Sequence, residues 1–254
     1  WSLYRREQFA DFDGQRPAGA PAQAFHESSE ILGKSRPPTP AEAAEMRHGY
    51  FANIAYLDAQ VGKLLDALDR SGVADRTVVV FVSDHGYHLG EHSLWGKTSN
   101  FEFDARVPML ISLPGQTRGA MTASFAELID LYPTLLEICG LPRKDRLDGT
   151  SLLPVLRDPA VTVKDAAFTQ HPRPAYFDRT KDGRPTTMGY SVRTKEGRYT
   201  EWRDWTTGQP VAREFYAAAD EPAETVNRID DPAHAGAVAA LEKMLQATHP
   251  RVGH

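Results

Sequence analysis

Cysteine is almost absent from this sequence, since Cys139 is the single one among 254 residues. One thiol cannot form a disulfide within the chain, which excludes a small domain held together by disulfides and leaves the redox compartment open. Cys139 follows an apolar run and precedes a glycine, at what we expect to be a helix end. We therefore predict a buried thiol that packs like a small hydrophobic side chain.

Long apolar runs and a surplus of one charge are also missing. The longest apolar run, near Val78 to Val82, has the length of a strand and falls far short of the roughly eighteen residues that cross a bilayer. The formal net charge of -5 comes from both signs mixed along the chain, which argues against a dedicated nucleic-acid binder. The first residues include neither an initiator Met nor an apolar signal region, so we expect a fragment or a processed chain. What remains is a globular protein with one domain or two small ones.

A long amphipathic helix is predicted after a connection rich in Gly, Pro, Ala and Ser that extends from Phe12 to Pro40. An N-cap, a first-turn proline and a capping-box partner are supplied by Thr39, Pro40 and Glu42. Apolar residues then recur at steps of three and four from Met46 to Leu68, so we expect one buried face. The opposite face carries the charged residues Arg47, Lys63 and Asp66. Gly72 ends the helix.

Strands and a second helix are predicted next. Residues 77–82 are β-branched or aromatic throughout, which predicts a central strand that is covered on both faces and belongs to a parallel sheet. A second strand is expected from Met109 to Leu113, between two prolines. Ser124 and Glu127 form another capping box, which predicts a helix that ends near Gly140.

The pattern changes beyond about residue 159, where an α+β tail replaces the α/β pattern. Alternating segments on both sides of residues 195–198 predict a hairpin. A short strand at residues 214–217 and a helix over residues 232–247 complete the tail. We therefore predict a connecting segment at residues 1–45, part of a large α/β domain at 46–158, and a small α+β subdomain at 159–254.

The segment richest in chemistry is the loop of residues 83–97, which begins where the first strand stops. In parallel α/β sheets, ligands bind beyond the carboxyl ends of the strands. Asp84 and His85 can converge on one ion through a carboxylate oxygen and an imidazole nitrogen, and Lys97 carries a compact positive charge suited to an oxyanion. Each residue taken singly also has a structural interpretation. Asp84 is then the N-cap of a helix and Lys97 a solvated surface residue.

A series of motifs lies between residues 80 and 111, namely Val-Phe-Val-Ser-Asp-His-Gly, Leu-Gly-Glu-His, Trp-Gly-Lys-Thr-Ser-Asn-Phe and Val-Pro-Met-Leu-Ile. In this order they resemble the second signature region of the sulfatases, a family of the alkaline-phosphatase superfamily, particularly its iduronate-2-sulfatase branch. The resemblance begins upstream near Gly49 and continues in the tail through Gln-His-Pro-Arg and Met-Gly-Tyr-Ser-Val-Arg-Thr, which ends at Thr194. It therefore covers most of the chain.

The resemblance implies the C-terminal half of a sulfatase fold, with a mixed central sheet flanked by helices and a small C-terminal antiparallel sheet with a helix. It implies that Asp84 and His85 ligate a divalent metal. Ca²⁺ is expected first, with Mg²⁺ or Mn²⁺ as alternatives, because many relatives place Asn at the position of His85. Lys97 is expected to hold the sulfate and to take part in catalysis. Tyr87 and His92 are candidate sugar contacts, and packing within the loop is their alternative.

The nucleophile of the family is a cysteine oxidised to formylglycine in an N-terminal Cys-x-Pro/Ala-x-Arg region, and this sequence contains no such motif. Cys139 is followed by Gly-Leu-Pro-Arg, so the role is not transferred to it. The resemblance therefore implies that an N-terminal part of the same protein supplies the nucleophile and the base, and that this chain alone is inactive. It also suggests an extracytoplasmic location, whether periplasmic, secreted or lysosomal.

The implied activity is hydrolysis of a sulfate ester on a sugar, with no nucleic-acid partner and no membrane span. Two alternatives stay open: phosphate or phosphonate ester hydrolysis within the same superfamily, and a degenerate binding module without catalysis. Further candidates for the sugar subsite are His88, His171 and Arg173.

Overall fold

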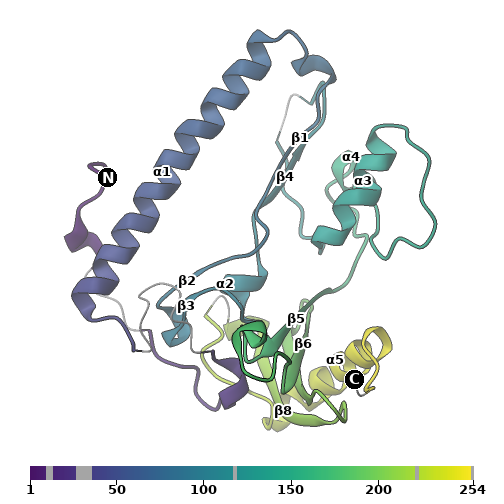
Figure 1. Cartoon of the computed structure of the whole chain (residues 1–254). Helices are drawn as coiled ribbons and strands as arrows, with labels where there is room; N and C mark the ends of the chain where they lie inside the picture. Colours follow the sequence, from purple (N-terminus) through teal and green to yellow (C-terminus); the bar gives the residue numbers. More distant parts are fainter. Residues whose placement is uncertain (10–13, 27–35, 117–118, 221–222, 253–254) are drawn as a thin grey trace. The chain divides into compact units, whose positions relative to one another are not determined.

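A computed structural model of the protein describes residues 1–9, 14–26, 36–116, 119–220 and 223–252 (Figure 1). The chain forms two compact units: unit 1 comprises residues 1–16, 27–97 and 106–118, and unit 2 comprises residues 17–26, 98–105 and 119–254. Parts of the expected connection, residues 12–13 and 27–35, lie outside the described residues. The subdomain boundary expected near residue 159 stays a prediction.

Unit 1 is built on a long helix, α1 (Pro40–Arg70), which begins where the sequence predicts it (Figure 1). The Thr39 hydroxyl accepts a hydrogen bond from the Glu42 backbone N–H at 3.3 Å, and the Glu42 carboxylate accepts one from the Thr39 N–H at 2.8 Å. This reciprocal pair is the predicted capping box. Gly72 follows the helix with a φ of 68°, a left-handed conformation that glycine adopts without strain.

The apolar face of α1 is not buried as its periodicity predicts. At least 44% of each of several large side chains is exposed among the described residues, namely Ile54, Leu57, Leu64 and Leu65. Burial is confined to the start of the helix and includes Arg47, which was expected on the solvated face. The Arg47 Nε donates to the Leu89 carbonyl at 2.8 Å, and its guanidinium lies 5.2 Å from the centre of the Trp95 ring. Periodicity identifies the residues that share a face, but it does not show which face another segment covers.

The two predicted strands of unit 1 are present as β1 (Val79–Val82) and β4 (Met109–Ser112). They pair antiparallel, so the prediction of a parallel partner is wrong for this pair. Phe81 and Val82 are 40% and 37% exposed, so β1 is not covered on both faces in the described chain. A continuous β-branched run favours a strand, whereas the direction of its neighbour depends on distant residues. The finer expectation of a mixed central sheet stays a prediction.

Short elements complete unit 1. They are the 3-10 helices η1 (Arg6–Phe9), η3 (Ala74–Arg76) and η4 (Glu91–Ser93) and the strands β2 (His88–Leu89) and β3 (Trp95–Gly96). Among the described residues of both units, no helix combines the length and apolar character needed to cross a membrane.

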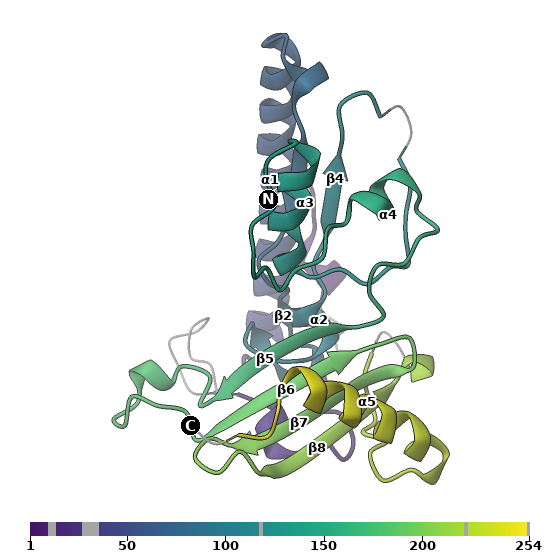
Figure 2. The same cartoon turned by 90° about the vertical axis from the view of Figure 1, so that its right-hand side faces the viewer.

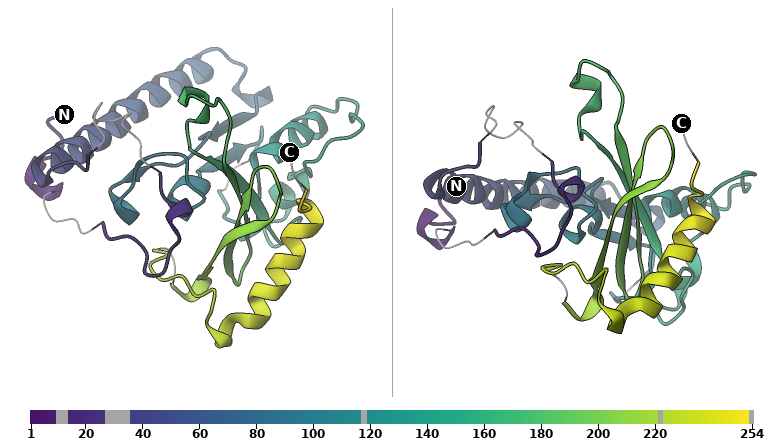
Figure 3. Two further views of the ribbon diagram at one scale, coloured as in Figure 1. Left: turned by 60° about the horizontal axis from the view of Figure 1, so that its bottom comes forward. Right: turned by 90° about the horizontal axis from the view of Figure 1, so that it is seen from below.

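Unit 2 centres on a four-stranded antiparallel sheet in the order β5-β6-β7-β8 (Figure 2). Its strands are β5 (Ala167–Arg173), β6 (Thr187–Arg193), β7 (Gly197–Asp204) and β8 (Pro210–Ala217). The predicted hairpin is confirmed, with Arg193 opposite Arg198. Helix α5 (Ala235–Thr248) lies along one face of the sheet (Figure 3). The core between them contains Val192, Tyr199, Phe215, Val238, Leu241 and Leu245.

The remaining elements of unit 2 are shorter. The α-helices are α2 (Glu102–Ala105), α3 (Leu131–Ile138) and α4 (Leu153–Arg157). The 3-10 helices are η2 (Ala22–Ala24), η5 (Leu128–Asp130), η6 (Phe177–Arg179), η7 (Ala218–Asp220) and η8 (Pro232–His234). The chain is therefore a mixed α/β protein with a separate antiparallel sheet.

The helix expected after Ser124 begins later than predicted. Its capping box joins Glu127 to Asp130, whose carboxylate accepts from the Glu127 N–H at 2.8 Å. Ser124 instead accepts a hydrogen bond from the Val163 N–H at 3.2 Å. Cys139 lies at the C-cap of α3 and is exposed, so its predicted burial is wrong. The position follows the last turn of the helix, beyond the part that packs inward.

A buried carboxylate, Glu214 of β8, gives the sheet a pH-dependent component. It accepts hydrogen bonds from the Trp202 Nε1–H and the Tyr216 hydroxyl, both at 2.6 Å. Burial raises the pKa of Glu214 from its ordinary 4.5 to about 7, although both hydrogen bonds act to lower it. An acid whose folded-state pKa is raised contributes full stability below its unfolded pKa. That stability is lost as the pH rises from about 4.5 to about 7.

We expect Glu214→Gln to remove this loss, because the amide stays neutral at every pH. From pH 5 to pH 8 the free energy of unfolding of the wild type should fall by up to about 3 kcal/mol relative to the variant. Urea denaturation at the two pH values measures the difference. Glu201→Gln is the matched control: burial alone would raise the pKa of Glu201, but hydrogen bonds from Arg251 and Arg203 lower it. That control should lose stability equally at both pH values. A gap between wild type and Glu214→Gln that does not change with pH would contradict the assignment.

Candidate functional site

The loop of residues 83–97 begins directly after β1 and contains a small hairpin. Its strands pair antiparallel, with His88 opposite Gly96 and Leu89 opposite Trp95. Gly90 and Gly96 have φ values of 113° and 89°, a region in which a side chain would be strained. The glycines of the loop therefore permit the turns that bring both ends of the hairpin together.

Asp84 and His85 form a pair of ligand atoms at the start of this loop. The Asp84 carboxylate accepts the His85 backbone N–H at 3.1 Å, and its other oxygen lies 3.7 Å from the His85 Nε2. The His85 Nδ1 lies 2.7 Å from the Gly86 carbonyl. Because a carbonyl can only accept, Nδ1 carries the proton and the neutral ring presents the Nε2 lone pair. Two acceptors then face each other, and a cation between them would satisfy both.

This pair suits a divalent cation in its chemistry. A histidine that ligates a metal through one nitrogen commonly donates its other N–H to a backbone carbonyl, as His85 does to Gly86. The Asp84 side chain is 86% exposed, so its oxygens are open to a ligand. However, within the described ranges no group of three or more His, Cys, Asp or Glu side chains could hold a metal ion. Asp84 and His85 therefore fit as part of a coordination shell and not as the whole of it.

The structure places Tyr87 and His92 within the packing of unit 1. The Tyr87 ring stacks on Tyr50 of α1, with centroids 5.4 Å apart and an interplanar angle of 28°. His92 is buried, and its Nδ1 lies 3.4 Å from the Nε2 of the fully buried His88. Packing thus describes these rings in this structure, and a sugar contact from Tyr87 or His92 stays a prediction.

Lys97 is half-buried and stands between two residues with left-handed backbone. Gly96 tolerates this conformation, whereas Thr98 is β-branched and has a φ of 85°. Such a conformation costs on the order of 1–3 kcal/mol and is retained where surrounding contacts enforce it, often at functional sites. The Thr98 hydroxyl oxygen is also buried without a hydrogen-bond partner in the part of the chain that the structure describes. The residue after Lys97 is therefore held in a strained position.

Arg173 has a structural role that sequence reasoning did not identify. Its side chain is buried and donates to the backbone carbonyls of Gln23, Ala24, Phe25, Thr98 and Pro172. The guanidinium lies 4.7 Å from the centre of the Trp202 ring, and burial lowers the pKa of Arg173 to about 10. A side chain committed to so many carbonyls does not reach a sugar, so the candidate role of Arg173 in a sugar subsite is wrong. His171, also on β5, stays a prediction.

Segment 98–105, which follows Lys97, was likewise missed as part of the site's support. Ser99, Asn100 and Asp104 are buried although they are polar. The one sequence signal was the density of polar residues directly after the Trp-Gly-Lys motif, which reads equally well as a solvated loop.

Two family models match the sequence. The model described as Sulfatase covers residues 9–141, and the model described as N-sulphoglucosamine sulphohydrolase, C-terminal, covers residues 90–251. The whole loop of residues 83–97 lies within the first of these.

Curated relatives have the same character. The iduronate 2-sulfatase of Homo sapiens is 30% identical over 287 residues, which cover 86% of this chain and 52% of the relative. That of Mus musculus is 31% identical and covers 78% of this chain and 46% of the relative. The choline-sulfatase of Rhizobium meliloti (strain 1021) is 43% identical over a shorter stretch, 43% of this chain and 22% of the relative. The chain spans about half the length of the iduronate 2-sulfatases that it matches.

Solved structures share the fold. A phosphonate monoester hydrolase of Agrobacterium radiobacter matches with a TM-score of 0.68 at 26% identity, over 84% of this chain and 43% of that chain. A protein in complex with its substrate D-glucosamine-2-N,6-O-disulfate matches with a TM-score of 0.66 at 25% identity, over 84% and 42%. Enzymes for phosphonate esters and a protein with a sulfated sugar substrate thus resemble the chain equally in structure.

Proposed function

The chain belongs to the sulfatase family, and from this we propose that it carries the metal-binding and sulfate-binding part of a sulfuric ester hydrolase that acts on a sulfated sugar. The observation that carries the proposal is the Asp84–His85 pair. Its Nε2 and carboxylate are available to one cation at the start of a loop that ends in Lys97. A sugar of the glycosaminoglycan type is the substrate class, by likeness to the iduronate 2-sulfatases.

Asp84 and His85 hold the divalent cation, with Ca²⁺ as first choice and Mg²⁺ or Mn²⁺ as alternatives. The bound cation supplies positive charge that polarises the sulfuryl oxygens. Lys97 places its ammonium against those oxygens, where a compact charge stabilises the negative charge of the ester and of the transition state. Glycine at position 96 lets the backbone beside Lys97 take the left-handed turn that this placement needs.

The nucleophile is a formylglycine supplied by polypeptide outside residues 1–254, because the sequence has no Cys-x-Pro/Ala-x-Arg motif and Cys139 is at a helix C-cap of unit 2. The exposed apolar side chains on α1 support a further polypeptide, since contiguous apolar surface is typical of an interface. We call this chain together with that polypeptide the complete enzyme.

The second candidate function is hydrolysis of a phosphate or phosphonate ester, which the match to a phosphonate monoester hydrolase favours. Both classes present an anionic oxygen cluster to a cation and a lysine, so residues 83–97 alone do not separate them. The curated relatives named above are sulfatases, and this favours the sulfate ester.

A substrate panel with one leaving group tests the choice. We expect the complete enzyme to hydrolyse 4-nitrophenyl sulfate with a kcat/KM at least about tenfold above those for 4-nitrophenyl phosphate and 4-nitrophenyl phenylphosphonate, about 1.4 kcal/mol of discrimination. Residues 1–254 expressed alone serve as the control and should be inactive. A preference for the phosphonate would establish the second candidate instead. Sulfate binding without turnover of any ester would identify a binding module.

The sugar is tested in the same assay with a 2-O-sulfated uronic acid disaccharide and with choline sulfate. We expect the disaccharide to be the better substrate, because the likeness to the iduronate 2-sulfatases covers most of this chain, whereas that to choline-sulfatase covers less than half. Faster hydrolysis of choline sulfate would overturn the sugar assignment and leave the sulfatase assignment intact.

A further inference from the structure

The segment of residues 98–105, called here the anchor segment, is fixed on the sheet of unit 2 at its very first residue. Thr98 is joined to Lys97 by a peptide bond, and the Thr98 carbonyl accepts a hydrogen bond from the Arg173 Nη1 at 3.0 Å. Arg173 is the last residue of β5 and is buried against Trp202. The peptide that follows Lys97 is therefore tied to a buried cation.

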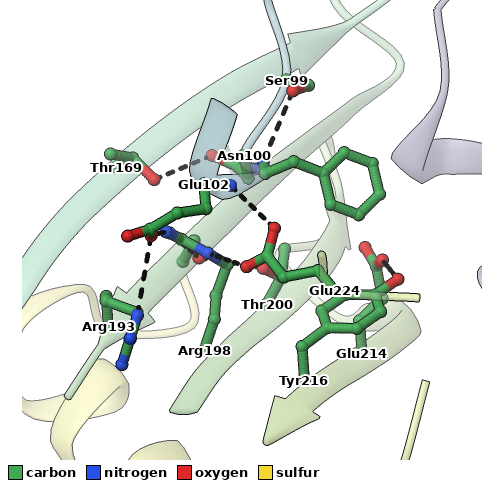
Figure 4. A network of polar contacts seen from close by, with 12 residues as sticks. Ser99, Asn100, Glu102, Thr169, Arg193, Arg198, Thr200, Glu214, Tyr216 and Glu224 are labelled. Carbon is green, nitrogen blue, oxygen red and sulfur yellow. Dashed lines mark hydrogen bonds and ion pairs between the residues drawn. The ribbon is translucent and has the colours of Figure 1, made fainter. Parts of the chain in front are cut away.

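Asn100 forms the next attachment. Its amide nitrogen donates to the Gly189 carbonyl of β6 at 3.2 Å, and its amide oxygen accepts from the Thr169 hydroxyl of β5 at 3.1 Å (Figure 4). Both donor and acceptor groups of this buried amide are used, so its orientation is defined. The segment is thus bound to two neighbouring strands within three residues of Lys97.

Glu102 forms the last attachment. Its backbone N–H donates to Glu224 at 2.7 Å, and its carboxylate accepts from Arg198 of β7 (Figure 4). The Arg198 Nε also donates to Glu224 at 2.7 Å, and both of these side chains are almost fully buried. Breaking one partner of such a buried charge network leaves another charge uncompensated, which makes the arrangement rigid.

We propose that Arg173 is a positioning residue for Lys97 and acts through the anchor segment. The inference rests on the proposed contact of Lys97 with the sulfuryl oxygens. Thr98 holds a backbone conformation that β-branched residues rarely adopt, and the bond from Arg173 to its carbonyl opposes relaxation of that peptide. Relaxation at Thr98 would rotate the peptide plane that it shares with Lys97 and so displace the lysine.

Arginine is required for this role because its planar fork reaches several carbonyls at once, whereas a lysine has a single ammonium on a flexible stem. Arg173→Lys keeps the buried charge and removes the fork. We expect it to lower kcat/KM by about 10- to 100-fold, as a small misplacement of a catalytic group does.

The matched control is Arg203→Lys. Arg203 is equally buried on the same sheet and also donates to backbone carbonyls, those of His249 and Pro250 at 2.8 and 3.1 Å. Its partners lie in the C-terminal tail and not in the anchor segment. We expect both variants to lower the thermal midpoint of the complete enzyme, and only Arg173→Lys to lower kcat/KM at temperatures below both midpoints.

A double-mutant cycle with Lys97→Ala separates positioning from general damage. If Arg173 acts through Lys97, the rate loss of Arg173→Lys should disappear in the Lys97→Ala background. A full additional loss in that background, or kinetics like those of Arg203→Lys, would overturn the positioning role while leaving the function of Lys97 intact. Lys97→Ala with wild-type kinetics would instead overturn the proposed function on which the inference rests.

A milder variant keeps the test decisive if Arg173→Lys does not fold. Thr169→Val is close to isosteric and removes only the hydroxyl that holds Asn100. We expect a loss of about threefold or more in kcat/KM, the size that one hydrogen bond carries, which again vanishes in the Lys97→Ala background. Unchanged kinetics of Thr169→Val would contradict the proposal.

Discussion

Asp84→Ala in the complete enzyme is expected to abolish ester hydrolysis and to release the bound divalent cation. The substitution removes an anionic oxygen and leaves the His85 Nε2 without its neighbour 3.7 Å away. A divalent ion that loses a charged oxygen ligand is under-coordinated, and its affinity falls steeply. Elemental analysis of wild type and variant, together with kcat/KM on a sulfated substrate, measures both effects.

The matched control for this prediction is Asp66→Ala, because Asp66 is exposed on α1 and lies far along the chain from the loop. It should retain metal and turnover. An Asp84→Ala protein with unchanged metal content and full activity would show that the cation, if one is bound, is held by other residues.

Lys97→Ala is expected to lower kcat/KM by about 10²-fold or more while it changes folding stability by less than about 0.5 kcal/mol. An ammonium that contacts the sulfuryl oxygens stabilises charge in the transition state, whereas a solvated lysine contributes little to anything. Both quantities are measured on the same preparation, from steady-state kinetics and from the thermal midpoint.

Lys63→Ala is the comparison for Lys97, since Lys63 is an exposed lysine on α1. It should match the wild type in both measurements. If Lys97→Ala behaves in the same way as Lys63→Ala, Lys97 is a solvated residue and the Asp84–His85 pair alone remains as support for the site.

Features with local causes were predictable from the sequence. The capping box at Thr39 and Glu42 and the hairpin between β6 and β7 depend on residues close together in the chain, and both are confirmed. The adjacency of Asp84 and His85 is also local, so their pairing could be expected. The hydrogen bond from the His85 ring to Gly86, which defines the free nitrogen, depends on the backbone path of the turn and could not be.

Features that depend on distant residues were not predictable. The antiparallel pairing of β1 with β4 and the exposure of the apolar side chains of α1 are set by neighbours outside each element. Arg173 reaches the Thr98 carbonyl across 75 positions and the Phe25 carbonyl across 148. A basic residue after Gln-His-Pro gives no sign of these partners, so it was interpreted as a sugar contact.

The most direct test of the proposed site is a crystal structure of the complete enzyme soaked with Ca²⁺ or Mn²⁺, with the ion located by anomalous scattering. We expect the ion within about 2.6 Å of an Asp84 carboxylate oxygen and of the His85 Nε2. An ion bound by other residues, with Asp84 and His85 both facing solvent, would contradict the assignment.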